Sequence, residues 1–318
     1  MDNLDRIQTM KVLFLCNRDF ANLGYLFAEC LKANDVSAIC MKVIYNPRKS
    51  VIGQGTIIKS KEHLRPFVEA ADVIIWMHSQ YVDLSGMNSA GKTFGVFHGG
   101  TKYRRSAKRV NKLFNPKIDF TLTQSTEGTM LNRGAKNESW VFPPVDTTML
   151  QPSYDMQDKI IIGHFPSQPK AKGSTQICSV INKLRNGPLK DHFTYMYGGS
   201  LVPWKRNLIN LAYCDIYIDS ITHAGWGLAI LEAAALGTIG VAGFGLRKEY
   251  EELYGPCPLP DLAAHDLDGL YNILETLILT DRKELIEKKK EYRQWVENYH
   301  TIEFIGKELK RTITNAIR

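Results

Sequence analysis

Short apolar runs alternate with longer amphipathic stretches through the first half of the chain. These runs are dense in Val, Ile and Phe, and they predict β-strands at residues 11–16, 36–43, 72–77, 93–98 and 119–123. Strands that alternate with helices in this way are typical of a parallel sheet covered on both faces. Because ligands of such sheets bind beyond the carboxyl ends of the strands, the residues after each strand are the first candidates for a site.

The same alternation continues in the second half of the chain. Apolar runs predict strands at residues 159–165, 193–197 and 215–219, and later segments predict helices at 281–299 and 302–317. A length of 318 residues fits about two domains of ordinary size. The whole pattern therefore predicts an α/β protein with two domains.

Residues 222–245, THAGWGLAILEAAALGTIGVAGFG, form a long apolar stretch. Its length suggests a membrane span, but Glu232 lies at its centre and glycines interrupt it. We therefore expect a glycine-rich turn, a helix at 228–236, a stop at Gly237 and a buried strand at 239–244. Burying the Glu232 carboxylate among alanines and leucines is costly unless a partner satisfies it, and we expect that partner to be a ligand.

Composition and cysteine usage restrict the class of protein. Hydrophobic residues make up 44% of the chain, which is enough to fill two cores and excludes a disordered protein. The six cysteines have no metal-type spacing and lie mostly in apolar segments, so we expect reduced core residues and a cytoplasmic protein. The first residues carry early acids and no apolar core, so no signal peptide is predicted.

Much of the positive charge lies in one segment. The net charge is +7, from 40 Lys and Arg against 33 Asp and Glu. The segment 102–117 contains no acid and carries these cations: Lys102, Arg104, Arg105, Lys108, Arg109, Lys112 and Lys117. Such a run is either a solvated face or a surface for an anionic partner.

The helix expected at 228–236 begins directly after a glycine-rich turn. A helix that opens this way offers free backbone N–H groups and the positive end of its dipole, which suits a phosphate or diphosphate. The alternative is a tight loop that lets helix and strand pack closely. A longer pattern combines GWGL at 225–228, LEA at 231–233 and Gly237. This pattern resembles the signature of glycosyltransferase family 4, and the resemblance covers nearly the whole chain in order.

Members of that family are retaining enzymes of the GT-B fold that use nucleotide-sugar donors. The resemblance therefore implies two Rossmann-like domains whose parallel sheets face each other across a cleft. It places residues 1–151 and the terminal helix 302–318 in an acceptor-side domain, and residues 152–301 in the nucleotide-sugar-binding domain. The boundary follows the segment PPVDTTML, which is similar to the family's interdomain segment.

The resemblance also assigns roles to individual residues. Two are expected in catalysis: His98, at a strand end near the transferred sugar, and Lys172 of a Lys-Gly pair, which neutralises the donor diphosphate. On its own, His98 also fits an ordinary strand-end histidine. Glu232 is expected to bind the donor ribose. The remaining residues expected to bind the donor are Gly24, Lys170, His223, Gly225, Trp226 and Gly227.

Three features depart from the family pattern. Ala224 stands where the first of two glutamates is usual, and the neighbouring His223 is the candidate replacement. The arginine that usually precedes the lysine is missing, and Lys170 is the candidate that covers for it. The segment 198–204, where the family contacts the nucleobase, is trimmed, so the sugar and the base of the donor stay open.

The resemblance implies a hexosyl- or pentosyltransferase that moves a sugar from a nucleoside-diphosphate sugar to an acceptor hydroxyl, without a metal ion or other cofactor. We expect an anionic acceptor at Arg104, Arg105, Lys108 and Arg109. DNA with a modified base is favoured over a lipid, because clustered Lys and Arg bind phosphates without sequence preference. Three alternatives stay open: transfer to a lipid or glycan at an anionic membrane, a non-catalytic nucleotide-sugar binding protein, and a sugar-nucleotide epimerase of the same fold.

Overall fold

The structure, a computed structural model, describes residues 9–44, 54–124, 134–199, 202–223 and 225–317. The chain forms two units, which are described separately below. Unit 1 comprises Met1–Pro144 and Ile302–Arg318, and unit 2 comprises Val145–Thr301. The division falls directly after Pro144, whereas the predicted boundary follows residue 151.

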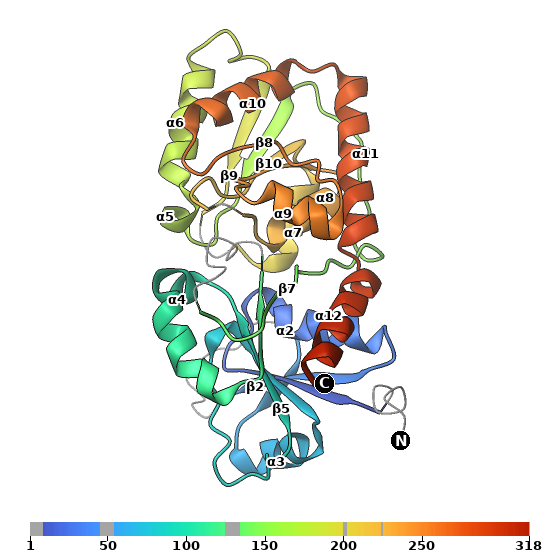
Figure 1. The fold of residues 1–318 in the computed structure, drawn as a ribbon. Coiled ribbons are helices and arrows are strands. Elements are labelled where there is room, and N and C mark those ends of the chain that lie inside the picture. The colour runs from blue at the N-terminus through green and yellow to red at the C-terminus, as the bar shows by residue number, and fades with distance from the viewer. Residues whose placement is uncertain (1–8, 45–53, 125–133, 200–201, 224, 318) are drawn as a thin grey trace. The chain divides into compact units, whose positions relative to one another are not determined.

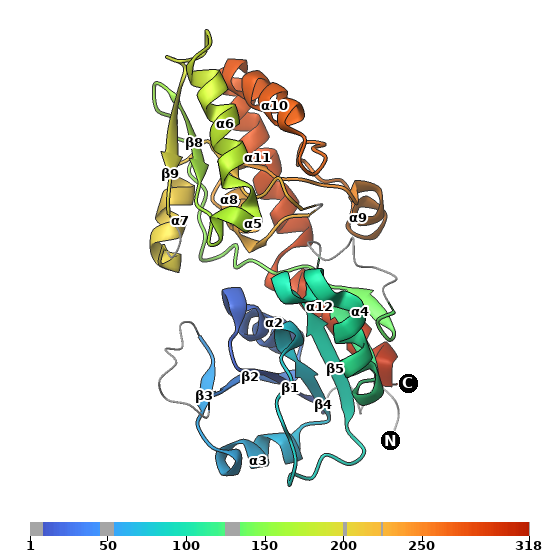
Figure 2. The same cartoon turned by 90° about the vertical axis from the view of Figure 1, so that its left-hand side faces the viewer.

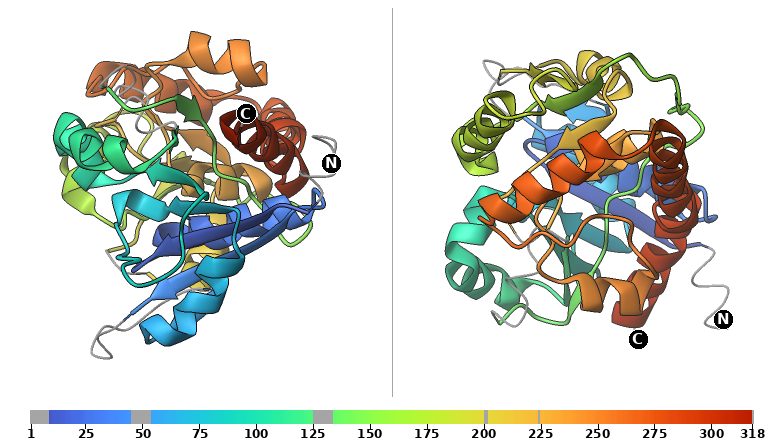
Figure 3. Two further views of the ribbon diagram at one scale, coloured as in Figure 1. Left: turned by 60° about the horizontal axis from the view of Figure 1, so that its bottom comes forward. Right: turned by 90° about the horizontal axis from the view of Figure 1, so that it is seen from above.

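Unit 1 is built on a seven-stranded sheet in which neighbouring strands pair in parallel, as the alternating pattern predicts. The strands are β1 (Lys11–Cys16), β2 (Ser37–Val43), β3 (Thr56–Ile58), β4 (Val73–Trp76), β5 (Thr93–His98), β6 (Phe120–Thr123) and β7 (Glu138–Trp140). Their order is β3-β2-β1-β4-β5-β6-β7, and the twist of the sheet is visible in the turned views of Figure 3. The short edge strand β3 was not predicted, because its three residues give too little pattern.

Helices cover both faces of the unit 1 sheet (Figure 1). They are α2 (Leu23–Lys32), α3 (Lys61–Ala70), α4 (Thr101–Phe114) and α12 (Ile302–Ile317), with short turns η1 (Phe20–Asn22), η2 (Met77–Ser79) and η3 (Asn115–Lys117). Phe27 of α2 packs on Phe14 of β1, and Val110 of α4 lies in the core of the opposite face. Gly306 lets α12 pack against α2, because a Cβ at Gly306 would collide with the Cys30 carbonyl oxygen.

Unit 2 contains a second parallel sheet of four strands in the order β11-β10-β8-β9. The strands are β8 (Ile160–His164), β9 (Phe193–Tyr197), β10 (Ile216–Ile218) and β11 (Ile239–Val241). The helices are α5 (Pro169–Lys172), α6 (Ser174–Arg185), α7 (Trp204–Ala212), α8 (Leu228–Ala235), α9 (Arg247–Tyr254), α10 (Leu267–Leu279) and α11 (Arg282–Tyr299). Figure 2 shows α6 and α10 side by side.

The helix and strand predicted within residues 222–245 are confirmed, with small changes at their ends. α8 begins at Leu228, directly after Gly227, and Gly237 follows the helix with a left-handed φ of 78°. β11 ends at Val241, before the predicted residue 244. Among the described residues, no helix combines the length and the apolar character that crossing a membrane requires.

A buried ion pair fixes the amino end of β10. Asp215 Oδ1 accepts a hydrogen bond from Lys289 Nζ of α11 at 3.0 Å, and Asp215 Oδ2 accepts the Ile161 N–H at 2.9 Å. The side chains of Lys289 and Asp215 are 2% and 4% exposed. Because both charges are buried and paired, this contact ties α11 to the sheet and leaves little room for a ligand.

Candidate active site

The candidate site of unit 2 lies at the carboxyl end of β10, where Asp219 directly follows the strand. Lys172 Nζ, at the end of α5, donates to both oxygens of the Asp219 carboxylate at 2.8 Å. The Gly227 N–H, at the start of α8, donates to Asp219 Oδ2 at 3.1 Å, and the Tyr217 hydroxyl donates to Oδ1 at 3.2 Å. Two groups that were predicted to bind a diphosphate therefore converge on one carboxylate of the chain itself.

The surroundings of Asp219 keep its side chain ionised. Burial alone raises the pKa of Asp219, which is 2% exposed. The Lys172 ammonium and the Gly227 N–H outweigh burial, and they hold the pKa of Asp219 below its ordinary value. The Lys172 side chain is 20% exposed, so part of the ion pair remains within reach of a ligand.

The Lys-Gly pattern has a local structural reason. Gly173 has a left-handed φ of 77° and separates α5 from α6. A Cβ at Gly173 would lie 2.9 Å from side-chain atoms of Ile221 and of Thr222. The glycine therefore lets α5 approach the segment after β10, and this approach brings Lys172 to Asp219.

Glu232 lies in α8 with 5% of its surface exposed. The indole Nε1 of Trp204, the first residue of α7, donates to Glu232 Oε1 at 2.7 Å. Burial raises the pKa of Glu232 to about 7, although the Trp204 hydrogen bond favours the charged form. The nearby Asp219 carboxylate raises this pKa further. The sequence predicted a ligand as the partner of Glu232, and the structure supplies Trp204 as a partner from the chain.

Trp226, which was predicted to bind the donor, lies in the core of unit 2. Its side chain is fully buried, with ring centroids 4.6 Å from Phe244, 5.3 Å from Tyr250 and 5.8 Å from Trp295. These edge-on contacts hold Trp226 against α9, α11 and the segment after β11. The core position of the indole leaves only the main chain of Trp226 for contact with a ligand.

The other residues predicted to bind the donor in unit 2 lie near α5 and α8. Lys170 is exposed on α5. His223 is half-buried and Gly225 is buried, while Ala224 between them lies outside the described residues. A Cβ at Gly243 would collide with the His223 carbonyl oxygen, so the chain after β11 packs closely on this turn.

In unit 1, His98 ends β5 and is fully buried. His98 Nδ1 lies 2.8 Å from Ser79 Oγ, and the imidazole stacks on Tyr103 of α4 with ring centroids 4.2 Å apart. Burial lowers the pKa of His98 to about 3, so the imidazole is neutral near neutral pH. Within the part of the chain that the structure describes, His98 Nε2 is buried and has no hydrogen-bond partner.

The start of α2 is also occupied by a carboxylate of the chain. Asp19 accepts the N–H of Gly24 at 2.8 Å and the N–H of Tyr25 at 2.9 Å, and His78 Nε2 lies 3.0 Å from Asp19 Oδ1. A Cβ at Gly24 would lie 3.0 Å from Cys40 Sγ, so this position requires close packing. Gly24, predicted to face the donor diphosphate, therefore already uses its N–H within the chain.

His78 and Ser79, in the turn η2 that follows β4, link these two contacts of unit 1. Both residues have a left-handed φ of 56°, which is uncommon in residues other than glycine. The turn places His78 on Asp19 and Ser79 on His98. Residues held in sparsely populated backbone regions gather at functional sites, which marks this end of the sheet as the candidate site of unit 1.

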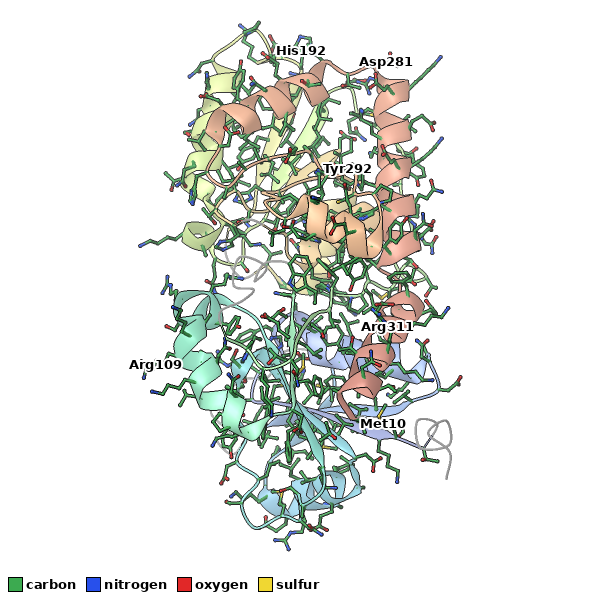
Figure 4. The ribbon with its side chains drawn as sticks, viewed as in Figure 1. Met10, Arg109, His192, Asp281, Tyr292 and Arg311 are labelled. Carbon is green, nitrogen blue, oxygen red and sulfur yellow. The ribbon has the colours of Figure 1, made fainter. Side chains whose placement is uncertain are left out.

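The predicted basic segment forms one side of α4. Arg105, Lys108 and Arg109 are exposed and Arg104 is half-buried, and we call these four the α4 basic face. Figure 4 shows Arg109 extending from α4 away from the sheet of unit 1. The apolar side of the helix is buried on its own sheet through Tyr103, Ala107, Val110 and Phe114.

No protein-family model matches the chain, and no curated protein matches it. Solved structures do resemble it over almost its whole length. Sucrose-phosphate synthase from Thermosynechococcus elongatus aligns with a TM-score of 0.66 at 14% identity, covering 96% of this chain and 98% of that chain. HepE of Anabaena, solved with UDP and glucose, aligns with a TM-score of 0.61 at 13% identity, covering 96% of this chain and 100% of that chain. A glycosyltransferase from Rickettsia africae aligns with a TM-score of 0.62 at 12% identity, covering 97% of this chain and 98% of that chain.

These structural neighbours are GT-B glycosyltransferases, so the likeness confirms the predicted fold. Sequence reasoning missed these residues of the two candidate sites: Asp219, Trp204, Asp19, His78 and Ser79. A usable signal existed for Asp219, because it is the last residue of the strand predicted at 215–219, and ligands of parallel sheets bind at that end. Trp204 lies at the end of the trimmed segment that was predicted to face the nucleobase.

Proposed function

We propose that the chain is a retaining glycosyltransferase that moves a sugar from a nucleoside-diphosphate sugar to an acceptor hydroxyl. The convergence of Lys172 and the start of α8 on Asp219 supports this function most directly. Both groups donate hydrogen bonds, as binding of a diphosphate requires. Glu232, farther along the same helix, offers the carboxylate for ribose hydroxyls. HepE, which has the same fold, was also solved with UDP-glucose.

In the proposed reaction, the chain stabilises the departing nucleoside diphosphate. The Lys172 ammonium and the N–H groups in the first turn of α8 face the negative charge that grows as the bond between sugar and diphosphate breaks. The acceptor hydroxyl then attacks from the face that the diphosphate leaves and gives its proton to the departing diphosphate oxygen, so the anomeric configuration is retained. His98 is neutral, and the family resemblance makes it the candidate to lie near the transferred sugar.

We propose that this charge stabilisation works without a metal ion. The positive potential comes from Lys172 and from the dipole of α8, so turnover should persist when divalent cations are chelated. Turnover with excess EDTA is expected to stay within about twofold of the untreated rate. A loss of turnover that Mg²⁺ or Mn²⁺ restores would contradict this part of the proposal.

For the acceptor we propose DNA that carries a modified base with a free hydroxyl. The α4 basic face supplies clustered cations for phosphates, and its position on unit 1 matches the acceptor side implied by the family resemblance. A helix that lies in a membrane interface needs a broad outward apolar side. The apolar side of α4 is instead engaged with its own sheet, and Leu113, at 60% exposure, adds little outward apolar surface.

Native mass spectrometry of the protein with a panel of nucleotide sugars tests the proposed donor. One nucleotide sugar should remain bound, and Lys172→Ala should weaken its retention. Failure to retain any nucleotide sugar would contradict the proposal. Proton NMR of the product then tests retention, because the anomeric configuration of the transferred sugar should equal that of the donor. A donor that binds but never releases nucleoside diphosphate with any acceptor favours the non-catalytic binding protein instead.

A further inference from the structure

We propose that the Asp219 carboxylate is an internal competitor that occupies the position of the donor phosphate before the donor binds and sets the affinity for anions there. This inference deepens the proposed function, because it concerns the same site. It assigns Asp219 a role in specificity. Simple phosphates would have to displace a carboxylate that the fold holds in place, whereas a nucleotide sugar can add contacts elsewhere.

The first argument is the set of contacts that Asp219 makes. Lys172 Nζ carries three N–H groups, and two of them donate to the two Asp219 oxygens, each at 2.8 Å. The Gly227 N–H, which would otherwise point at a ligand at the start of α8, donates to Asp219 Oδ2. A phosphate that binds to the same donors must therefore replace Asp219 at these groups.

The second argument concerns charge. Lys172 and Asp219 together carry no net charge, so their pair presents less positive potential than the lysine and the helix terminus suggest. A diphosphate placed beside an ionised Asp219 would be repelled strongly, because the carboxylate is 2% exposed and poorly screened by water. Neutralising Asp219 therefore removes both a competitor for the donors and a source of repulsion.

The third argument comes from comparison with the other buried pair on β10. Asp215 and Lys289, at the amino end of the strand, have side chains that are 4% and 2% exposed, so both partners are closed off. In the pair at the carboxyl end, Asp219 is equally buried but the Lys172 side chain is 20% exposed. The same strand thus carries a closed structural pair and a pair that a ligand can reach.

Calorimetric titration with inorganic pyrophosphate and with UDP tests the inference. Asp219→Asn should tighten the binding of both probes by at least about tenfold, and by a similar factor, because both use the diphosphate position. Adding Lys172→Met to Asp219→Asn should abolish the gain. Asp215→Asn, which neutralises the buried aspartate at the other end of β10, should leave both affinities within about twofold of wild type.

Unchanged or weaker binding by a folded Asp219→Asn variant would overturn the inference, since it would show that Asp219 only holds Lys172 in place. Asp219→Ser, whose hydroxyl can accept the Gly227 N–H, serves as a second variant if the first does not fold. A crystal structure of the wild-type protein with UDP gives a test that needs no variant. The inference requires that Lys172 turn from Asp219 to the diphosphate, and an intact Lys172–Asp219 pair with bound UDP would overturn it.

The inference and the proposed function can fail separately. Pyrophosphate binding requires no acceptor and no sugar transfer, so a tighter, Lys172-dependent affinity in Asp219→Asn would stand even if no transferase activity were found. Conversely, glycosyl transfer by the wild-type protein, with unchanged anion affinity in Asp219→Asn, would overturn only the role of Asp219.

Discussion

The indole nitrogen of Trp204 donates a 2.7 Å hydrogen bond to the carboxylate of Glu232 inside unit 2. Trp204 is 38% exposed and Glu232 is 5% exposed, so the bond connects a surface residue with a buried acid. A carboxylate has two oxygens and can accept further hydrogen bonds beside the one from Trp204. Glu232 therefore has both a partner that orients it and capacity left for ribose hydroxyls.

Replacing Glu232 with Gln should weaken donor binding. The amide keeps the shape of the side chain but removes the charged acceptor, and a hydrogen bond to a charged group contributes about 1.5–3 kcal/mol. Donor affinity measured by calorimetry should therefore fall at least about tenfold. Glu284→Gln, at a side chain that is 62% exposed on α11, is the matched control and should bind the donor as the wild type does. An unchanged affinity in a folded Glu232→Gln variant would rule out the ribose assignment.

Glu232 should also make folding stability depend on pH. Its pKa is raised from the ordinary 4.5 to about 7 in the folded protein, so the fold favours the protonated acid. Stability from this group is full below pH 4.5, falls as pH rises toward 7, and is constant above that value. The loss amounts to roughly 3 kcal/mol, from about 1.4 kcal/mol for each pKa unit.

Urea unfolding of wild type and Glu232→Gln at several pH values measures this effect. Because Gln does not ionise, the variant should gain stability relative to wild type between pH 4.5 and 7. A stability difference that stays constant over that range would show that Glu232 ionises as an ordinary glutamate in the fold.

Removing the Lys172 ammonium should affect turnover more than donor binding. In the proposed reaction, Lys172 faces the charge that develops on the leaving diphosphate, and loss of one such preorganised donor costs about 10²–10³ in turnover in other enzymes. Steady-state kinetics of Lys172→Ala at saturating donor measures this effect, with the exposed Lys190→Ala as the control. If the turnover of Lys172→Ala stays within about twofold of the wild-type value, groups other than Lys172 stabilise the charge on the leaving diphosphate.

The α4 basic face should carry DNA binding. Changing Arg104, Arg105, Lys108 and Arg109 together to Ala should weaken binding of duplex DNA and flatten its salt dependence. The slope of log affinity against log salt should become about 0.9 less steep for each phosphate that the variant no longer neutralises. Titration at several salt concentrations measures the slope.

A control variant with the same loss of charge distinguishes this face from general attraction. Changing Lys248, Lys283, Lys288 and Lys290 of unit 2 to Ala removes four cations from other helices and should leave the slope nearly as in wild type. Absent DNA binding, or equal slopes in wild type and the α4 variant, would contradict a DNA acceptor. Binding of anionic vesicles that only the α4 variant loses would identify a lipid acceptor instead.

Local sequence patterns were sufficient to predict much of unit 2. The apolar run with Glu232 at its centre predicted α8, and Gly237 predicted where the helix ends. Both features depend on neighbours within a few positions of the chain, so the sequence displays them directly. The Lys-Gly pair also lies close to the start of α8, while the role of Lys172 toward the donor diphosphate rests on the family resemblance and stays a prediction.

The interactions that the sequence did not reveal join residues that are distant along the chain. Asp219 and Lys172 are 47 positions apart, and Trp204 and Glu232 are 28 apart. The approach of α5 to the segment after β10 and the packing of α7 on α8 bring these side chains together. For Trp226, the sequence pattern was misleading about the side chain. Its place in the motif predicted contact with a ligand, but its side chain packs edge-on against Phe244 in the core.

The most direct test of the proposed function is release of nucleoside diphosphate by the wild-type protein. The retained donor from the panel is incubated with and without duplex DNA that contains hydroxymethylated bases, and both products are followed by mass spectrometry. A glycosyltransferase with a DNA acceptor should release nucleoside diphosphate only when this DNA is present, and the DNA should gain the mass of one sugar per modified base. Release without any acceptor, or a bound donor that no DNA, lipid or glycan acceptor converts, would contradict the proposed function.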